Sequence, residues 1–85
     1  MRPRPSSTAA TSPLREHVAH AVQRYLSDLG DTVDGELRAF VLREVEEPLF
    51  REVMSHYEGN QTRAAAALGI NRATLRKRLR DLGLD

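Results

Sequence analysis

Residues 59–80 read GNQTRAAAALGINRATLRKRLR, and they hold six of the thirteen Lys and Arg residues of the chain. Asn60 is a favoured N-cap residue, because its side chain can accept a hydrogen bond from a backbone N–H of the first helical turn. Gly69 can adopt the left-handed conformation that ends a helix without a steric cost. The stretch therefore predicts a short helix over residues 61–68 that stops at a tight turn.

A second helix is predicted directly after this turn, with Asn71 as its N-cap, residues 72–82 as its body and Gly83 as its end. Two short helices joined by a tight turn that contains glycine have the layout of a helix-turn-helix. Small or apolar side chains would let the two helices cross closely: Ala64, Ala65, Leu68, Ile70, Leu75, Leu79 and Leu82. Residues 59–85 are thus predicted to form a DNA-binding segment.

Polar and cationic side chains make up nearly all of the remaining surface of the last helix. In a helix-turn-helix the N-terminal half of this helix enters the major groove of DNA, where Arg can bond to guanine and Asn to adenine. Arg72 and Arg76 are four residues apart on one helical face, so both are candidates for contacts with base edges. Beside these two arginines, the candidate DNA-binding residues are Asn60, Gln61, Thr62, Arg63, Asn71, Thr74, Lys77, Arg78 and Arg80. Asn71 and Thr74 lie next to the arginines, whereas the other cations and the residues of the shorter helix are assigned to phosphates.

The charge of the chain is unevenly distributed, although the net charge is only +1. Residues 60–85 carry six cations against two carboxylates, whereas residues 14–59 carry five arginines against ten carboxylates. A basic end on an acidic body predicts a polyanionic partner that meets one face of the protein. A solvated basic helix is the simpler interpretation of a charge run, but the caps, the turn and the small residues all favour DNA binding here.

The composition excludes several other classes of function. Eighty-five residues form one domain at most, and a core this thin usually needs a partner chain. The chain has no cysteine, and His17, His20 and His56 complete no recognisable metal motif, so neither a metal nor another cofactor is expected. An enzyme is not expected, because no nucleophile–base pair, carboxylate pair or phosphate loop stands at a workable spacing. The absence of a secretory signal and of an apolar run of ~18 residues predicts a cytoplasmic protein.

The first helix is predicted to follow a tail. Residues 1–12 are rich in Ser, Thr and Pro and are predicted to be disordered. Ser12 and Pro13 form a favoured helix start, because Ser can cap the first turn and Pro needs no hydrogen-bond donor there. Apolar residues then recur with gaps of three and four up to Leu29, and Gly30 is expected to stop this helix.

A second helical pattern of apolar residues follows, and its stripe is wide enough to be buried on more than one side. Asp34 is expected to cap this helix and Gly59 to end it. Pro48 lies inside the pattern, which continues in phase beyond it, so a kink is expected there rather than a break. The sequence thus predicts an all-α chain of four helices, of which residues 13–58 hold the first two.

Three stretches resemble the Fis family of bacterial nucleoid-associated DNA-binding proteins: PLREHVAHAVQRYL, FVLREVEEPLFREVMSHYEGNQTR with its proline at position 48, and GNQTRAAAALGINRATLRKRL. The likeness covers residues 13–85 and implies an intertwined homodimer formed by the first two helices of each chain. The dimer core would take Val18, Val22, Tyr25, Leu26, Leu37, Phe40, Val41, Val45 and Leu49. The resemblance also implies that the two recognition helices lie closer together than one turn of DNA, so that the DNA must bend to meet both. Weak specificity would follow, because the cost of bending depends on untouched, AT-rich central bases.

The resemblance also implies a transcription regulator of the nucleoid in which Arg72 contacts guanine, with RNA polymerase as a further candidate partner. The C-terminal module is similar to that of sigma-54-dependent activators as well, and a helical module that binds only proteins is a third alternative. Family members that activate DNA inversion carry a longer N-terminal arm than the twelve residues before Pro13, so recombinase activation is not expected. Glu58 and Asp81 replace basic residues of the best-known member, which implies weaker phosphate contacts.

Overall fold

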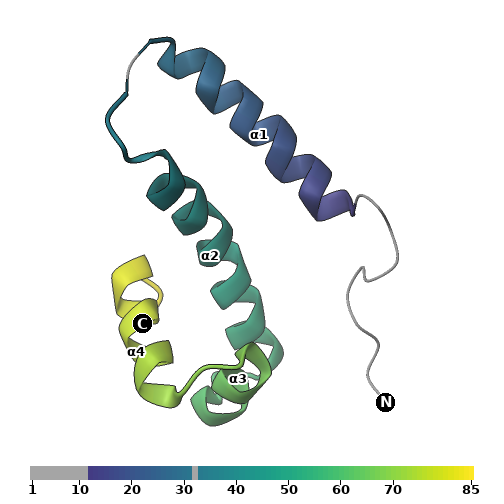
Figure 1. Cartoon of the computed structure of the whole chain (residues 1–85). Helices are drawn as coiled ribbons and strands as arrows, with labels where there is room; N and C mark the ends of the chain where they lie inside the picture. The colour runs from purple at the N-terminus through teal and green to yellow at the C-terminus, as the bar shows by residue number, and fades with distance from the viewer. Residues whose placement is uncertain (1–11, 32) are drawn as a thin grey trace. The chain divides into compact units, whose positions relative to one another are not determined.

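The structure, a computed structural model, describes residues 12–31 and 33–85. The described residues form four helices and no strand, namely α1 (Pro13–Leu29), α2 (Leu37–His56), α3 (Gln61–Leu68) and α4 (Arg72–Leu82), as labelled in Figure 1. The all-α prediction is therefore confirmed. The disordered tail predicted over residues 1–12 lies outside the described residues, apart from Ser12. The chain divides into two compact units, Met1–Asp34 and Gly35–Asp85.

The ends of α1 are set by the two local signals that the sequence carries. The Oγ atom of Ser12 accepts a hydrogen bond from the backbone N–H of Arg15 at 3.1 Å, and Pro13 occupies the first helical position. At the other end, the N–H of Gly30 donates to the carbonyl of Leu26 at 3.3 Å. The predicted helix start and stop are both confirmed. Within α1 no side chain is buried, so this helix has no core of its own.

The start of α2 differs from the sequence prediction. Glu36, not Asp34, is the N-cap residue of α2, and its side chain makes no capping hydrogen bond. Gly35 lies between them with a φ of 75°, which is left-handed and cannot belong to a right-handed helix. A helix capped by Asp34 would have to include Gly35 as its first residue. The helix therefore begins beyond it, at Leu37.

The end of α2 also lies earlier than Gly59. The last helical residue is His56, and the chain then turns through Glu58 and Gly59, whose φ angles are 53° and 82°. Two successive residues with positive φ unwind the chain, and the N–H of Gly59 closes the turn by donating to the carbonyl of Met54 at 3.0 Å. Pro48 is inside a continuous helix, as expected. The kink expected at this proline stays a prediction.

Residues 60–83 fold as predicted. The Oδ1 atom of Asn60 accepts from the N–H of Arg63 at 3.1 Å, and the Oδ1 atom of Asn71 accepts from the N–H of Thr74 at 2.7 Å. Each of the two helices ends at a left-handed glycine, with a φ of 77° in the first case and 74° in the second. The tight turn between α3 and α4 follows from the left-handed glycine and the asparagine cap together.

The core of the unit Gly35–Asp85 lies where the C-terminal half of α2 meets α3 and α4. Its buried side chains are Phe50, Ala64, Ala65, Leu75 and Leu79. Partly buried apolar residues surround them: Val53, Met54, Tyr57, Leu68, Ile70, Leu82 and Leu84. The alanines of α3 have no side chain beyond Cβ, so α4 can approach closely enough to bury Leu75 completely. In Figure 1, α4 follows the turn after α3 and runs beside α2.

Candidate nucleic-acid interface

The cations of α4 lie on the sides of the helix that the core leaves open. Leu75 and Leu79 point into the core, and all five cations of the helix are exposed: Arg72, Arg76, Lys77, Arg78 and Arg80. Successive residues turn by ~100° around an α-helix, so Arg72 and Arg76 share one side. Arg78 is turned by about 200° from Arg76 and therefore lies on the opposite side. The basic surface of α4 is thus divided between two sides of the helix.

Asn71 has a structural role as well as a predicted DNA contact. Its Oδ1 atom caps α4 through Thr74, whose side chain is half-buried. Bidentate pairing with adenine uses both the oxygen and the nitrogen of an amide, so Asn71 would have to accept a second hydrogen bond at the same oxygen. Arg72 and Arg76 make no ion pair among the described residues. Their guanidinium groups are therefore stronger candidates for contacts with base edges than the amide of Asn71.

The N-terminus of α3 presents a second group of predicted contact residues. Thr62 and Arg63 are exposed, whereas Gln61 is half-buried and Asn60 caps the helix. The guanidinium of Arg63 lies over the ring of Tyr57, with its central carbon 5.4 Å from the ring centroid. This cation–π contact holds the guanidinium of Arg63 against Tyr57, which lies in the turn that precedes α3.

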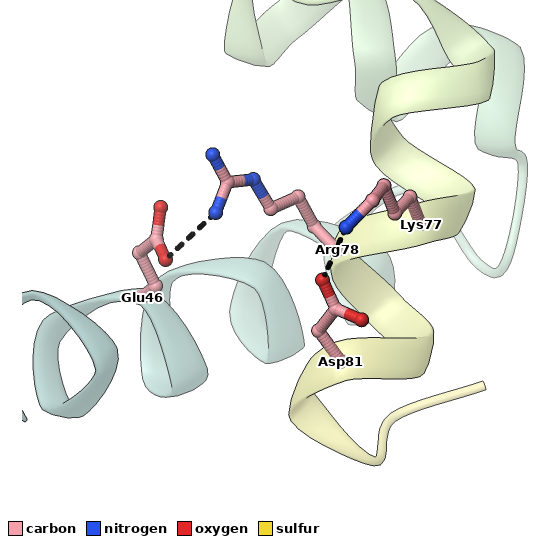
Figure 2. Close-up of polar contacts among 4 residues, drawn as sticks. All are labelled: Glu46, Lys77, Arg78 and Asp81. Carbon is pink, nitrogen blue, oxygen red and sulfur yellow. Dashed lines mark hydrogen bonds and ion pairs between the residues drawn. The ribbon is translucent and has the colours of Figure 1, made fainter. Parts of the chain in front are cut away.

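Two of the predicted phosphate-binding cations have carboxylates beside them (Figure 2). The Nζ atom of Lys77 donates a hydrogen bond to Oδ2 of Asp81 at 3.0 Å within α4. The guanidinium of Arg78 reaches across to α2, where one of its terminal nitrogens lies 3.8 Å from Oε1 of Glu46. The hydrogen bond from Lys77 is the main reason that the pKa of Asp81 lies below its usual value, so this carboxyl stays ionised to a lower pH than an ordinary aspartate.

Sequence reasoning singled out Asp81 but missed Glu46. The spacing of four residues between Lys77 and Asp81 is a helical pairing distance and could have revealed the first pair. The second pair joins two helices that are far apart in the sequence, so no local pattern reveals it. Glu46 and Arg78 also line an open groove of about 700 Å³ between α2 and α4, together with Arg38, Ala39, Leu42, Arg43, Asp81 and Leu82.

The residues predicted to form a dimer core remain accessible in the single chain. Leu26, Phe40 and Leu49 are 51%, 45% and 45% exposed. The other predicted core residues are half-buried: Val18, Val22, Tyr25, Leu37, Val41 and Val45. None of these nine belongs to the buried core of the helix-turn-helix, so the two sets of apolar residues are separate.

The described part of the chain also lacks two other kinds of feature. No group of three or more His, Cys, Asp or Glu side chains there could hold a metal ion. None of the helices is both long and apolar enough to cross a membrane.

Comparison with known proteins gives a consistent result. Residues 41–82 match the family model described as "Bacterial regulatory protein, Fis family". A protein of Xylella fastidiosa strain Temecula1, named as Fis-like and DNA-binding, is 58% identical over 83 residues, which are 98% of this chain and 92% of that protein. The proteins named "DNA-binding protein Fis" include those of Glaesserella parasuis, 53% identical over 85% of this chain and 74% of the relative, and Pasteurella multocida, 49% identical over 92% and 79%.

Proposed function

This chain belongs to the Fis family of bacterial regulatory proteins, and on that premise we propose that it binds double-stranded DNA through α4 and regulates transcription. The observation that carries the proposal is that α4 has one buried apolar face and an exposed cationic surface. Leu75 and Leu79 fix the helix to a closed core, and the five cations of the same helix stay exposed to a polyanion.

The proposed contacts fall into two groups. Arg72 and Arg76 read base edges in the major groove, because they share one side of α4 next to its N-terminus. The remaining proposed contacts position the protein on the DNA backbone or flank the bases: Asn60, Gln61, Thr62, Arg63, Asn71, Thr74, Lys77, Arg78 and Arg80. Removal of a base-reading arginine should change sequence preference, whereas removal of a phosphate contact should weaken binding to all sequences alike.

The DNA-binding form is proposed to be a homodimer held by residues 13–58. Large apolar side chains exposed on α1 and α2 support this proposal, because exposed apolar surface is commonly covered by a partner. Leu14, Leu26, Phe40, Leu42 and Leu49 are each more than two-fifths exposed in the single chain. A dimer would place two copies of α4 on one DNA molecule.

A dimer of this kind is proposed to bend DNA and to bind with weak sequence specificity, because bending favours sites with a deformable, AT-rich centre. The protein would act in the cytoplasm, on the nucleoid, as a non-catalytic regulator. RNA polymerase is a candidate protein partner.

Gel-shift titration tests the proposal on a duplex with an AT-rich centre, at several salt concentrations. Each neutralised phosphate releases counterions and contributes a slope of about −0.9 to the plot of log affinity against log salt. Tight binding with a steep negative slope is expected, and circularly permuted duplexes should migrate differently when the DNA is bent. An absence of binding at low salt would overturn the proposal in favour of a module that binds only proteins.

A further inference from the structure

Two of the five cations of α4 are already next to carboxylates of the same unit of the chain (Figure 2). Lys77 donates to Asp81 from the preceding turn of α4, and Arg78 extends away from the Arg72–Arg76 side toward Glu46 on α2. The side chains of both pairs remain open to solvent, because Lys77 and Asp81 are 70% and 50% exposed and Arg78 and Glu46 are 50% and 32% exposed. A DNA phosphate could therefore reach either cation.

A cation beside a carboxylate is a weaker partner for DNA than a cation alone. The pair has no net charge, and the carboxylate repels the approaching phosphate over distances of about one Debye length, roughly 8–10 Å at physiological salt. For Lys77 and Arg78 to contact phosphates, they must leave Asp81 and Glu46 or share their charge with them. DNA can therefore bind Lys77 or Arg78 only if the ion pair with Asp81 or Glu46 is first weakened or broken.

We propose that Glu46 and Asp81 are internal counter-ions that compete with DNA phosphates for Arg78 and Lys77. This inference rests on the proposed function, since it concerns the same DNA-binding surface. It assigns to the two carboxylates the regulation of affinity and of salt dependence. Glu46 lies on α2 rather than on the recognition helix, so a residue of the proposed dimerisation segment would tune DNA binding directly.

The expected size of the effect follows from the exposure of the pairs. Exposed ion pairs are weak, so release of one cation should strengthen DNA binding by about twofold to fivefold for each copy of α4 on the DNA. One additional phosphate contact should also make the salt slope steeper by about one. Both effects should be largest at low salt and should fade as salt screens the surface charges.

Glu46→Gln and Asp81→Asn test the inference, because each change removes the charge and keeps the size of the side chain. Glu47→Gln is the matched control, since Glu47 is the next residue of α2 and pairs with Arg51, which is also on α2. DNA affinity is measured against salt for the wild type and the three variants, with circular dichroism to verify that each is folded. Glu46→Gln and Asp81→Asn should bind DNA more tightly than the wild type, and Glu47→Gln should match the wild type.

A second pair of measurements separates competition from a general charge effect. Glu46→Gln is repeated in an Arg78→Gln background, and Asp81→Asn in a Lys77→Gln background. If each carboxylate acts through its partner cation, its removal should give no gain once that cation is absent.

Three results would overturn the inference while leaving DNA binding intact: no change in the single variants, a gain that persists without the partner cation, or a loss of affinity. The last result would mean that Glu46 or Asp81 positions the cation for DNA instead of competing for it. If the wild type itself fails to bind, the proposed function fails first, and the two failures are therefore distinct.

Discussion

Residues 50–84 enclose five buried side chains with only two short helices and the end of a third, whereas α1, a helix of 17 residues, buries none. The difference lies in the side chains rather than in helix length. In α3, two alanines allow close approach of neighbouring helices, so that two leucines and one phenylalanine are enough to fill the core. The apolar stripe of α1 contains larger residues, and none of them is buried. The C-terminal part of the chain thus has a core of its own, whereas α1 has none, and we propose that a second copy of the chain covers α1.

The largest expected effect is on the proposed dimer core, to which α1 and the first part of α2 contribute residues. Val45→Asp would place one carboxylate per chain in the proposed dimer core, where a buried charge without a partner is very costly. We expect the dimer to be lost, so that light scattering after gel filtration gives the mass of one chain. Val33→Asp is the matched control, because Val33 is 93% exposed and should tolerate the same change. A Val45→Asp protein that remains a dimer would show that the proposed core is wrong.

The second prediction concerns the stability of the core that α2, α3 and α4 form. Leu75 is completely buried, so Leu75→Ala should lower the free energy of unfolding by ~2–5 kcal/mol through lost contacts and a cavity. Urea denaturation measures this loss. Leu14→Ala in α1 removes the same atoms from a residue that is 64% exposed and should cost less than about 1 kcal/mol. Equal losses at the two positions would remove the distinction between the two halves.

The third prediction concerns DNA affinity and not folding, and its expected size is smaller. Arg72→Ala should weaken binding to a preferred DNA site by ~1–3 kcal/mol, because a bidentate contact with guanine would be lost. Arg24→Ala removes an exposed arginine from α1 and should leave affinity nearly unchanged. Fluorescence anisotropy with a labelled duplex measures both variants. A similar loss for the two arginines would indicate that total charge, not the position on α4, governs binding.

The smallest effect concerns the cap of the recognition helix. Asn71→Ala removes the acceptor for the N–H of Thr74 and should lower the free energy of unfolding by ~1 kcal/mol. Asn71→Ser, which keeps a capping oxygen, should recover most of that loss. Thermal denaturation without DNA separates this structural role from any base contact. If alanine and serine are equally destabilising, the cap is not what Asn71 contributes.

Local signals in the sequence predicted most helix ends. The caps of α1, α3 and α4 were all identified, because a capping side chain and the N–H that it binds are only three residues apart. The sequence does not predict the start of α2 correctly. Gly35 is left-handed, so the helix begins after it and not directly after Asp34, and the side chain of the N-cap residue Glu36 makes no capping hydrogen bond. The end of α2 was misplaced because Glu58 adopts a positive φ, which is unusual for a residue other than glycine.

Charge predicted which residues face solvent, but not which partners they meet. The sequence predicts a phosphate contact for Arg63, and the structure places its guanidinium over the ring of Tyr57. The sequence predicts phosphate contacts for Lys77 and Arg78 as well, and both lie beside carboxylates of the protein. The candidate DNA surface was therefore predictable as a set of cations, whereas the division between available and paired cations was not.

The sequence by itself determined the four helices, the turn at Gly69 and the basic character of α4, since each depends on residues within a few positions of one another. Only the tertiary structure decided that Glu46 meets Arg78 and that Leu75 is completely buried. Both depend on α4 packing against α2 and α3, which brings together residues that are distant along the chain. Periodicity and capping act over one or two helical turns, so they cannot specify a contact that forms only when helices pack.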